Sequence, residues 1–171
     1  MKKSKDYTEA QNAADAAAMA AMFRLIDECP KPVVGRVQGL ALGGACGLVA
    51  CCDVAVAVEE AQFGFSEVRL GIIPAVISNF VTPAIGTRAA RRYFVTGERF
   101  PAQEAYRLGL VHEVVKADQL DKRVDEIVKF IFQSGPMAVA AAKQLLRDVE
   151  GMARNLAVDH TVKTIARLRV S

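Results

Sequence analysis

Apolar side chains near the start of the chain recur at helical spacing. They follow the i, i+3, i+4, i+7 pattern of one helix face: Met19, Met22, Phe23 and Ile26. Alanines, which favour helix, fill much of the remainder. The pattern predicts a helix over residues 8–28, with Thr8 as its N-cap and with Pro30 and Pro32 ending it.

Two short runs rich in valine follow this helix. Residues 33–37 and 54–58 read as buried strands, because strands covered on both faces lack the alternation of half-exposed ones. Glycines at 39, 43 and 44 separate the runs and precede the small residues of 45–52. We therefore expect a tight turn that leads into a small-residue helix packed in the interior.

The second half of the chain favours helices. After Phe65 we expect an irregular stretch through Pro74 and Ser78. The segments that come next are expected to be helices at 87–94 and 101–109, a strand at 110–115, and two or three helices over about 118–133, 136–149 and 152–169. The chain thus divides into an α/β part, residues 1–115, and a helical part, residues 116–171.

Composition and charge exclude two classes of function. Apolar residues make up 52% and charged residues 24% of the 171, as in soluble globular proteins. A net charge of +3 is too small to favour nucleic-acid binding. The uncharged segment 37–52 is shorter than the ~20 apolar residues that a membrane span needs. One basic group could meet phosphate, although its helical spacing favours a solvated face: Arg88, Arg91, Arg92 and Arg99.

The cysteines give no sign of a metal site. Cys29, Cys46, Cys51 and Cys52 show neither CxxC nor His-rich spacing. We interpret them as free thiols in a reducing compartment and predict a cytoplasmic protein without metal or cofactor.

Two segments could carry chemistry. In residues 39–47, GLALGGACG, glycines allow the backbone to approach a ligand, and the first helical amides have no intrahelical acceptor. Such amides suit an anion or a developing oxyanion. Taken alone, however, this pattern is more often explained by close packing.

Glu67 is the second candidate, because it stands in an apolar stretch, AQFGFSEVRLGIIP at 61–74. A carboxylate in apolar surroundings has a raised pKa, which suits acid/base catalysis. For an isolated glutamate, a surface position at the end of a strand is the more common explanation.

Together, these segments carry a family resemblance. KPVVGRVQGLALGGACGLVACCDVAVA at 31–57, followed by 61–74, resembles the core of the crotonase (enoyl-CoA hydratase/isomerase) family, and residues 84–115 resemble its next block. The resemblance implies an α/β fold, with part of the crotonase ββα spiral followed by a helical C-terminal region for association. Family members are usually trimers or hexamers.

The resemblance also assigns roles by position. Gly44 matches the residue whose backbone N–H forms half of the oxyanion hole, and Glu67 matches the second of the two hydratase glutamates. Gly43, Gly47 and Ala75 would contact the substrate. Gly47 stands where the hydratases carry their first catalytic glutamate, so Glu67 would act alone or with help from the substrate. On this basis a glutamate restored at position 47 is expected to speed hydration of crotonyl-CoA.

The details GGACGLVACCD and SEVRLGIIPAVIS are most similar to the bacterial methylglutaconyl-CoA hydratase group. That likeness implies a hydro-lyase for branched or carboxylated α,β-unsaturated acyl-CoA in leucine or terpene breakdown, with coenzyme A as part of the substrate. Two alternatives stay open, a single-glutamate isomerase or decarboxylase and a truncated inactive paralogue. The resemblance also implies that an N-terminal part, with the other oxyanion-hole amide, and the extreme C-terminus are missing.

Overall fold

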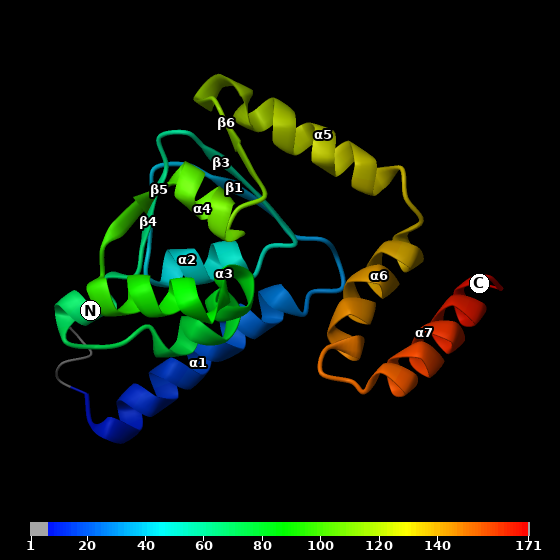
Figure 1. The fold of residues 1–171 in the computed structure, drawn as a ribbon, viewed down its shortest axis with the longest axis horizontal. Helices are drawn as coiled ribbons and strands as arrows, with labels where there is room; N and C mark the ends of the chain where they lie inside the picture. Colours follow the sequence, from blue (N-terminus) through cyan, green and yellow to red (C-terminus); the bar gives the residue numbers. More distant parts are fainter. Residues whose placement is uncertain (1–6, 171) are drawn as a thin grey trace.

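Two small sheets form the α/β part of the chain in a computed structural model that describes residues 7–170 (Figure 1). The first sheet has the order β1-β3-β6 and is entirely parallel: β1 is Val34–Val37, β3 is Val54–Val58 and β6 is Glu113–Val115. The central strand β3 is almost completely buried, as expected for an apolar run in a parallel sheet. Both predicted strands are therefore confirmed, but β1 is only partly buried, with Arg36 exposed.

The second sheet was not predicted. It has the order β2-β4-β5: β2 is Leu40–Leu42, β4 is Gln62–Gly64 and β5 is Arg99–Pro101. β2 and β4 are parallel, and β4 and β5 are antiparallel. Strands of three residues are too short to show a period, and β2 lies within the glycine-rich segment that we had expected to be a turn.

α1, Glu9–Asp27, confirms the first predicted helix. Thr8 caps it, and a reciprocal hydrogen bond pairs Thr8 with Gln11. The buried face is narrower than predicted, because Phe23 is 1% exposed whereas Met19 and Met22 are each more than 40% exposed. Phe23 thus carries most of the contact between α1 and the core.

α2, Gly44–Ala50, contacts both α1 and the long helix α3, Ala75–Thr96. The prediction of an irregular chain through Ser78 is wrong, because α3 begins directly after Pro74. The Ser78 hydroxyl donates to the Ala75 carbonyl at 2.6 Å and is accommodated within the first turn. Non-helical angles at Gly86 interrupt α3, so the segment predicted at 87–94 corresponds to its second part.

Apart from η2, which lies in the stretch expected to be irregular, the remaining helices agree with the predicted ones. They are η2, Ser66–Leu70; α4, Ala102–Leu108; η3, Ala117–Gln119; α5, Leu120–Phe132; α6, Pro136–Val149; and α7, Arg154–Leu168. α5 packs on the first sheet, and α7 contacts α6 and lies farther from the two sheets than α6 does (Figure 1). Within residues 7–170, no helix is long and apolar enough to cross a membrane. The division of the chain at residue 115 stays a prediction.

Two ion pairs connect α6 to the core. Lys143 Nζ lies 2.7 Å from Asp53 Oδ2, and that oxygen also accepts the Val33 N–H. Arg147 pairs with Asp27 at 3.5 Å. The position of α6 beside the sheet therefore depends on charge as well as on apolar packing.

Candidate active site

Glu67 lies in the η2 turn, directly after strand β4. The turn is anchored by Phe65, which is fully buried and packs edge-on against Phe94 with ring centroids 4.8 Å apart. Phe63, two residues earlier, is also fully buried and stacks on Phe100. These aromatic contacts hold the main chain on one side of Glu67 in a fixed position.

The Glu67 carboxylate lies against the backbone of Gly43. A Cβ atom built on Gly43 would stand 2.9 Å from Glu67 Oε1 and 3.3 Å from Cδ. Gly43 also has a φ of 56°, in the region that side chains other than glycine rarely adopt. Both the backbone conformation and the nearby carboxylate therefore require glycine here.

The environment of Glu67 favours its neutral form. Its Oε2 atom is buried and has no hydrogen-bond partner among the described residues. Burial raises the pKa of the Glu67 carboxyl above its usual value, and a bond from its own backbone amide lowers it only in part. A carboxyl with a raised pKa and an uncommitted oxygen is suited both to giving and to taking a proton.

The start of α2 is fixed to the strand that leads to Glu67. The Gly43 N–H donates to the Gly64 carbonyl at 2.9 Å, and the Cys46 thiol donates to the carbonyls of Ala41 and Gly64 at 2.9 and 3.6 Å. Burial raises the pKa of Cys46 to about 12, so the thiol keeps its proton and stays a donor. Gly44 is the first residue of α2, and its N–H points away from the helix without an intrahelical acceptor.

Gly47 lies one turn further along α2, where two core side chains fill the space. A Cβ at Gly47 would stand 2.6 Å from Ile77 Cγ2 and 3.0 Å from the Phe23 ring. A carboxylate at this position would require Phe23 and Ile77 to move. Glu67 is therefore the carboxylate that the structure places beside α2, while Gly47 allows α1 and α3 to approach closely.

Ala75 lines an apolar cavity of about 380 Å³ on the other side of the η2 turn. Val68, the residue after Glu67, forms part of the same wall together with Ile73. The Ala75 N–H is already bonded to the Ile73 carbonyl at 2.8 Å. The structure thus gives Ala75 a place in an apolar wall adjoining the turn that carries Glu67.

Comparison with known sequences assigns the family. The sequence profile described as Enoyl-CoA hydratase/isomerase matches residues 2–164. The chain belongs to the enoyl-CoA hydratase/isomerase family. The 171 residues correspond to only part of the proteins they resemble.

A crotonyl-CoA hydratase from Syntrophomonas wolfei is 40% identical over 123 residues, which are 71% of this chain and 47% of that protein. A 2,3-dehydroadipyl-CoA hydratase from Escherichia coli is 36% identical over 124 residues, 72% of this chain and 49% of that protein. The chain thus spans about half the length of these relatives.

Solved structures of the family confirm the predicted crotonase fold. An enoyl-CoA hydratase from Shewanella pealeana superposes with a TM-score of 0.95 at 43% identity, covering 100% of this chain and 64% of that one.

Some residues of this family site were not found from the sequence. The Gly64 carbonyl, which accepts from both Gly43 and Cys46, leaves no sequence signal because a backbone oxygen is common to every residue. Phe23 and Ile77 were recognisable as apolar positions, but not as the side chains that fill the space at Gly47.

Proposed function

We propose that this chain carries the catalytic acid/base and half of the oxyanion hole of an enoyl-CoA hydratase, a hydro-lyase for α,β-unsaturated acyl-CoA thioesters. The observation that carries the proposal is the half-buried Glu67 carboxyl, whose Oε2 is buried without a hydrogen-bond partner among the described residues and whose Oε1 lies close to Gly43 at the start of α2. The Gly44 N–H, at the positive end of α2, would donate a hydrogen bond to the thioester oxygen as that oxygen gains negative charge.

A single carboxyl group is enough for both proton transfers of the hydration reaction. Neutral Glu67 gives its proton to the α-carbon of the thioester, while the oxygen of water forms a bond to the β-carbon. The proton that this water loses returns to the Glu67 carboxylate. The raised pKa of Glu67 suits this cycle, because the group must be neutral at one step and ionised at the next.

For the acyl group, we propose a branched or carboxylated chain of the methylglutaconyl type. The support is the likeness of residues 43–53 and 66–78 to that group. The names of the two relatives indicate straight-chain substrates with and without a terminal carboxylate, so both kinds belong in the assay.

The deciding experiment measures hydration of methylglutaconyl-CoA and crotonyl-CoA by the chain, alone and fused to the N-terminal segment of a longer relative. Glu67→Gln keeps the shape and removes the acid, so kcat should fall about 10²–10⁴-fold with little change in KM. Glu60→Gln, at an exposed position, is the matched control and should leave kcat unchanged. Near-full turnover by Glu67→Gln would overturn the assignment.

A single-glutamate isomerase or decarboxylase is the second candidate, and one observation favours it. The space beside Gly47 is filled by Ile77 and Phe23, which leaves Glu67 without a carboxylate partner on α2. Isomerisation needs one group that carries a proton between two carbons and needs no water. Turnover of an acyl-CoA with an unconjugated double bond, with no hydration of the conjugated isomer, would select this function.

We also propose a homo-oligomer, a trimer or hexamer. Large apolar side chains are exposed on the helices after residue 115: Phe130, Phe132, Leu146, Leu156, Val158, Val162 and Ile165. Exposed apolar surface of this extent is typical of an interface. Sedimentation equilibrium tests the assembly, and a monomer at micromolar concentration would contradict it. The free thiols of all four cysteines support the proposed cytoplasmic location.

A further inference from the structure

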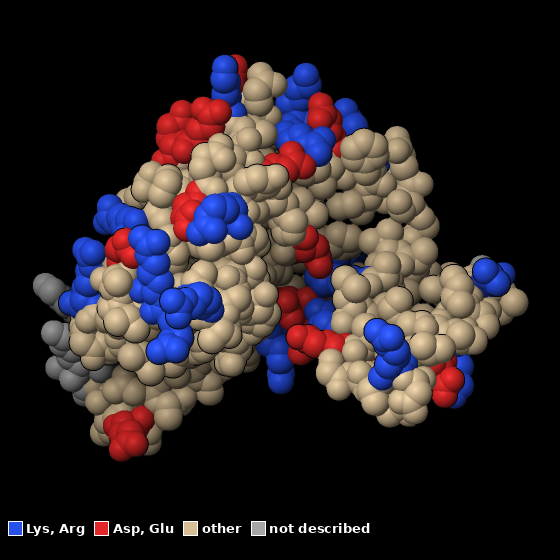
Figure 2. Space-filling view, viewed as in Figure 1, with Lys and Arg blue, Asp and Glu red and all other residues tan. Residues whose placement is uncertain are grey.

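Basic side chains gather over the part of the surface formed by α3 and α4 (Figures 1 and 2). A cavity of about 730 Å³ lies there, lined by Arg88, Arg91 and Arg92 from α3 and by Arg107 from α4. Of the arginines that cluster in the sequence, Arg99 does not line the cavity. The α3 face that was expected to be solvated is thus one wall of a cavity. Arginines from α3 and α4 both line this cavity.

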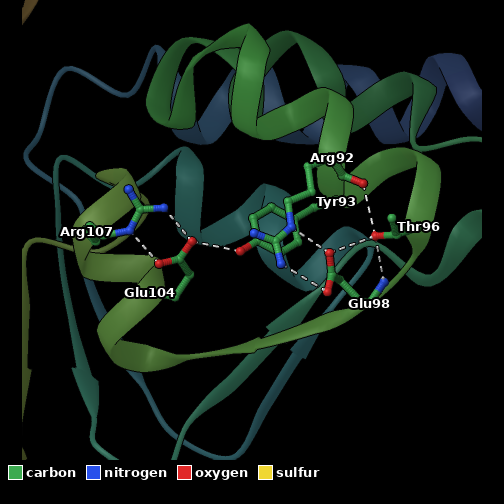
Figure 3. Close-up of polar contacts among 6 residues, drawn as sticks. All are labelled: Arg92, Tyr93, Thr96, Glu98, Glu104 and Arg107. Carbon is green, nitrogen blue, oxygen red and sulfur yellow. Dashed lines mark hydrogen bonds and ion pairs between the residues drawn. The ribbon is translucent and has the colours of Figure 1, made fainter.

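Two of the four arginines are neutralised within the protein (Figure 3). Arg92 binds both carboxylate oxygens of Glu98 at 2.8 and 3.3 Å, and Arg107 binds both oxygens of Glu104 at 2.6 Å. The Tyr93 hydroxyl also donates to Glu104 at 2.8 Å. The Arg107 guanidinium, followed by this hydroxyl, lowers the pKa of Glu104 to about 2, so this carboxylate stays ionised and fully engaged.

Arg88 and Arg91 have no carboxylate partner among the described residues. Neither makes an ion pair within residues 7–170, where the carboxylates that line or adjoin the cavity are already taken by Arg92 and Arg107. The two arginines are three residues apart on one helix and therefore share a face, so their like charges repel unless an anion lies between them. The rest of the wall includes the apolar residues Ile85, Val95 and Leu108.

We propose that this cavity is a binding site for a small phosphate-bearing anion, with Arg88 and Arg91 as the groups that bind the phosphate. The planar guanidinium matches phosphate oxygens in a two-pronged geometry and is the side chain preferred for this contact. The volume is within the range of roughly 300–1,000 Å³ that is usual for small-molecule sites. Glu67, Gly43, Gly44 and Ala75 take no part in its lining, so the site is separate from the candidate active site.

The test uses inorganic pyrophosphate as the probe, titrated calorimetrically into the purified chain at low ionic strength. The double variant Arg88→Gln/Arg91→Gln should bind at least about tenfold more weakly, because it loses both charge-assisted contacts. Arg167→Gln/Arg169→Gln removes the same charge from exposed positions on and next to α7 and should change the affinity less than about twofold. Pyrophosphate should also raise the melting temperature of the wild type but not of the first variant.

Two results would overturn the proposal. One is an absence of binding by the folded wild-type chain, and the other is equal weakening by the two double variants, which would indicate nonspecific attraction to net charge. Competition by coenzyme A distinguishes the source of the phosphate. Displacement of pyrophosphate would identify the phosphates of the acyl-CoA substrate, and its absence would identify an independent small phosphate ligand.

Discussion

The Glu67 carboxylate and the Gly43 backbone are in direct contact, with Oε1 2.9 Å from where a Gly43 Cβ would stand. The adjacent glycine has no such neighbour, because a Cβ at Gly44 would meet only the Phe23 ring at 3.9 Å. Glycine is therefore required at position 43 for a reason that does not apply at position 44. Substitutions at the two positions should have different effects.

Gly43→Ala should lower both stability and activity. The alanine would be held at φ 56° and ψ −120°, a sparsely populated conformation that costs on the order of 1–3 kcal/mol. Its methyl group would displace the Glu67 carboxylate. Gly44→Ala is the matched control, since it places a methyl group in ordinary contact within a helix and should unfold no more easily than the wild type. Urea titration of both variants checks this, and equal loss in the two would contradict it.

Gly44→Pro tests the oxyanion-hole role of the Gly44 amide. Proline is well tolerated at the first position of a helix and removes only the N–H. Loss of one such donor should reduce kcat about 10²–10³-fold, whereas Gly44→Ala, which keeps the N–H, should stay near wild type. If Gly44→Pro folds and turns over normally, the thioester oxygen is not bound at this amide.

Substitutions of Gly47 by larger residues should destabilise the protein. Gly47→Ala brings a methyl group to 2.6 Å from Ile77 Cγ2, and overpacking of this kind costs roughly 1–3 kcal/mol. Gly47→Glu should lose more stability and gain no hydration of crotonyl-CoA, contrary to the expectation from sequence, because Phe23 and Ile77 occupy the space. In a double-mutant cycle that combines Gly47→Ala with Ile77→Ala, the second substitution should offset part of the stability lost by the first. If the two changes in unfolding free energy simply add, the methyl group at position 47 does not collide with Ile77.

The raised pKa of Glu67 predicts a pH-dependent effect on stability. Burial favours the neutral carboxyl, so its contribution is fully present below the ordinary glutamate pKa and is lost as pH rises through the higher folded-state pKa. Glu67→Gln cannot ionise and should be more stable than the wild type at neutral pH, with the difference shrinking toward pH 4. Urea midpoints across this pH range measure it, and a constant difference would show that Glu67 titrates as in water.

Much of the fold was readable from local sequence, and the exceptions have physical reasons. The strand at 54–58 and the helix capped by Thr8 carry strong signals, an unbroken apolar run and a reciprocal cap. β2, β4 and β5 exist only through their pairing with one another, as when Phe63 lies opposite Ala41 on one side and Phe100 on the other. Ser78 was placed in a stretch expected to be irregular, although its hydroxyl can bond back to the Ala75 carbonyl within a helix.

The candidate site was likewise predictable from sequence only in part. Glu67 and the glycines at 43 and 44 came from motif residues, and the structure brings Glu67 and Gly43 together. The sequence could not show whether the space beside Gly47 is open. Phe23 and Ile77 fill that space from helices that are distant in the sequence. The arginine cavity likewise required Arg107, which lies outside the cluster visible at 88–99.

The shared attachment of Gly43 and Cys46 to the Gly64 carbonyl has a mechanical consequence. Gly64 is the last residue of β4, three residues before Glu67, so a displacement of this strand is expected to carry Glu67 and the first turn of α2 in the same direction. The spacing between the Glu67 carboxyl and the Gly44 N–H is then preserved while the surrounding sheet fluctuates. Weakening this attachment would broaden the distribution of that spacing without changing its mean.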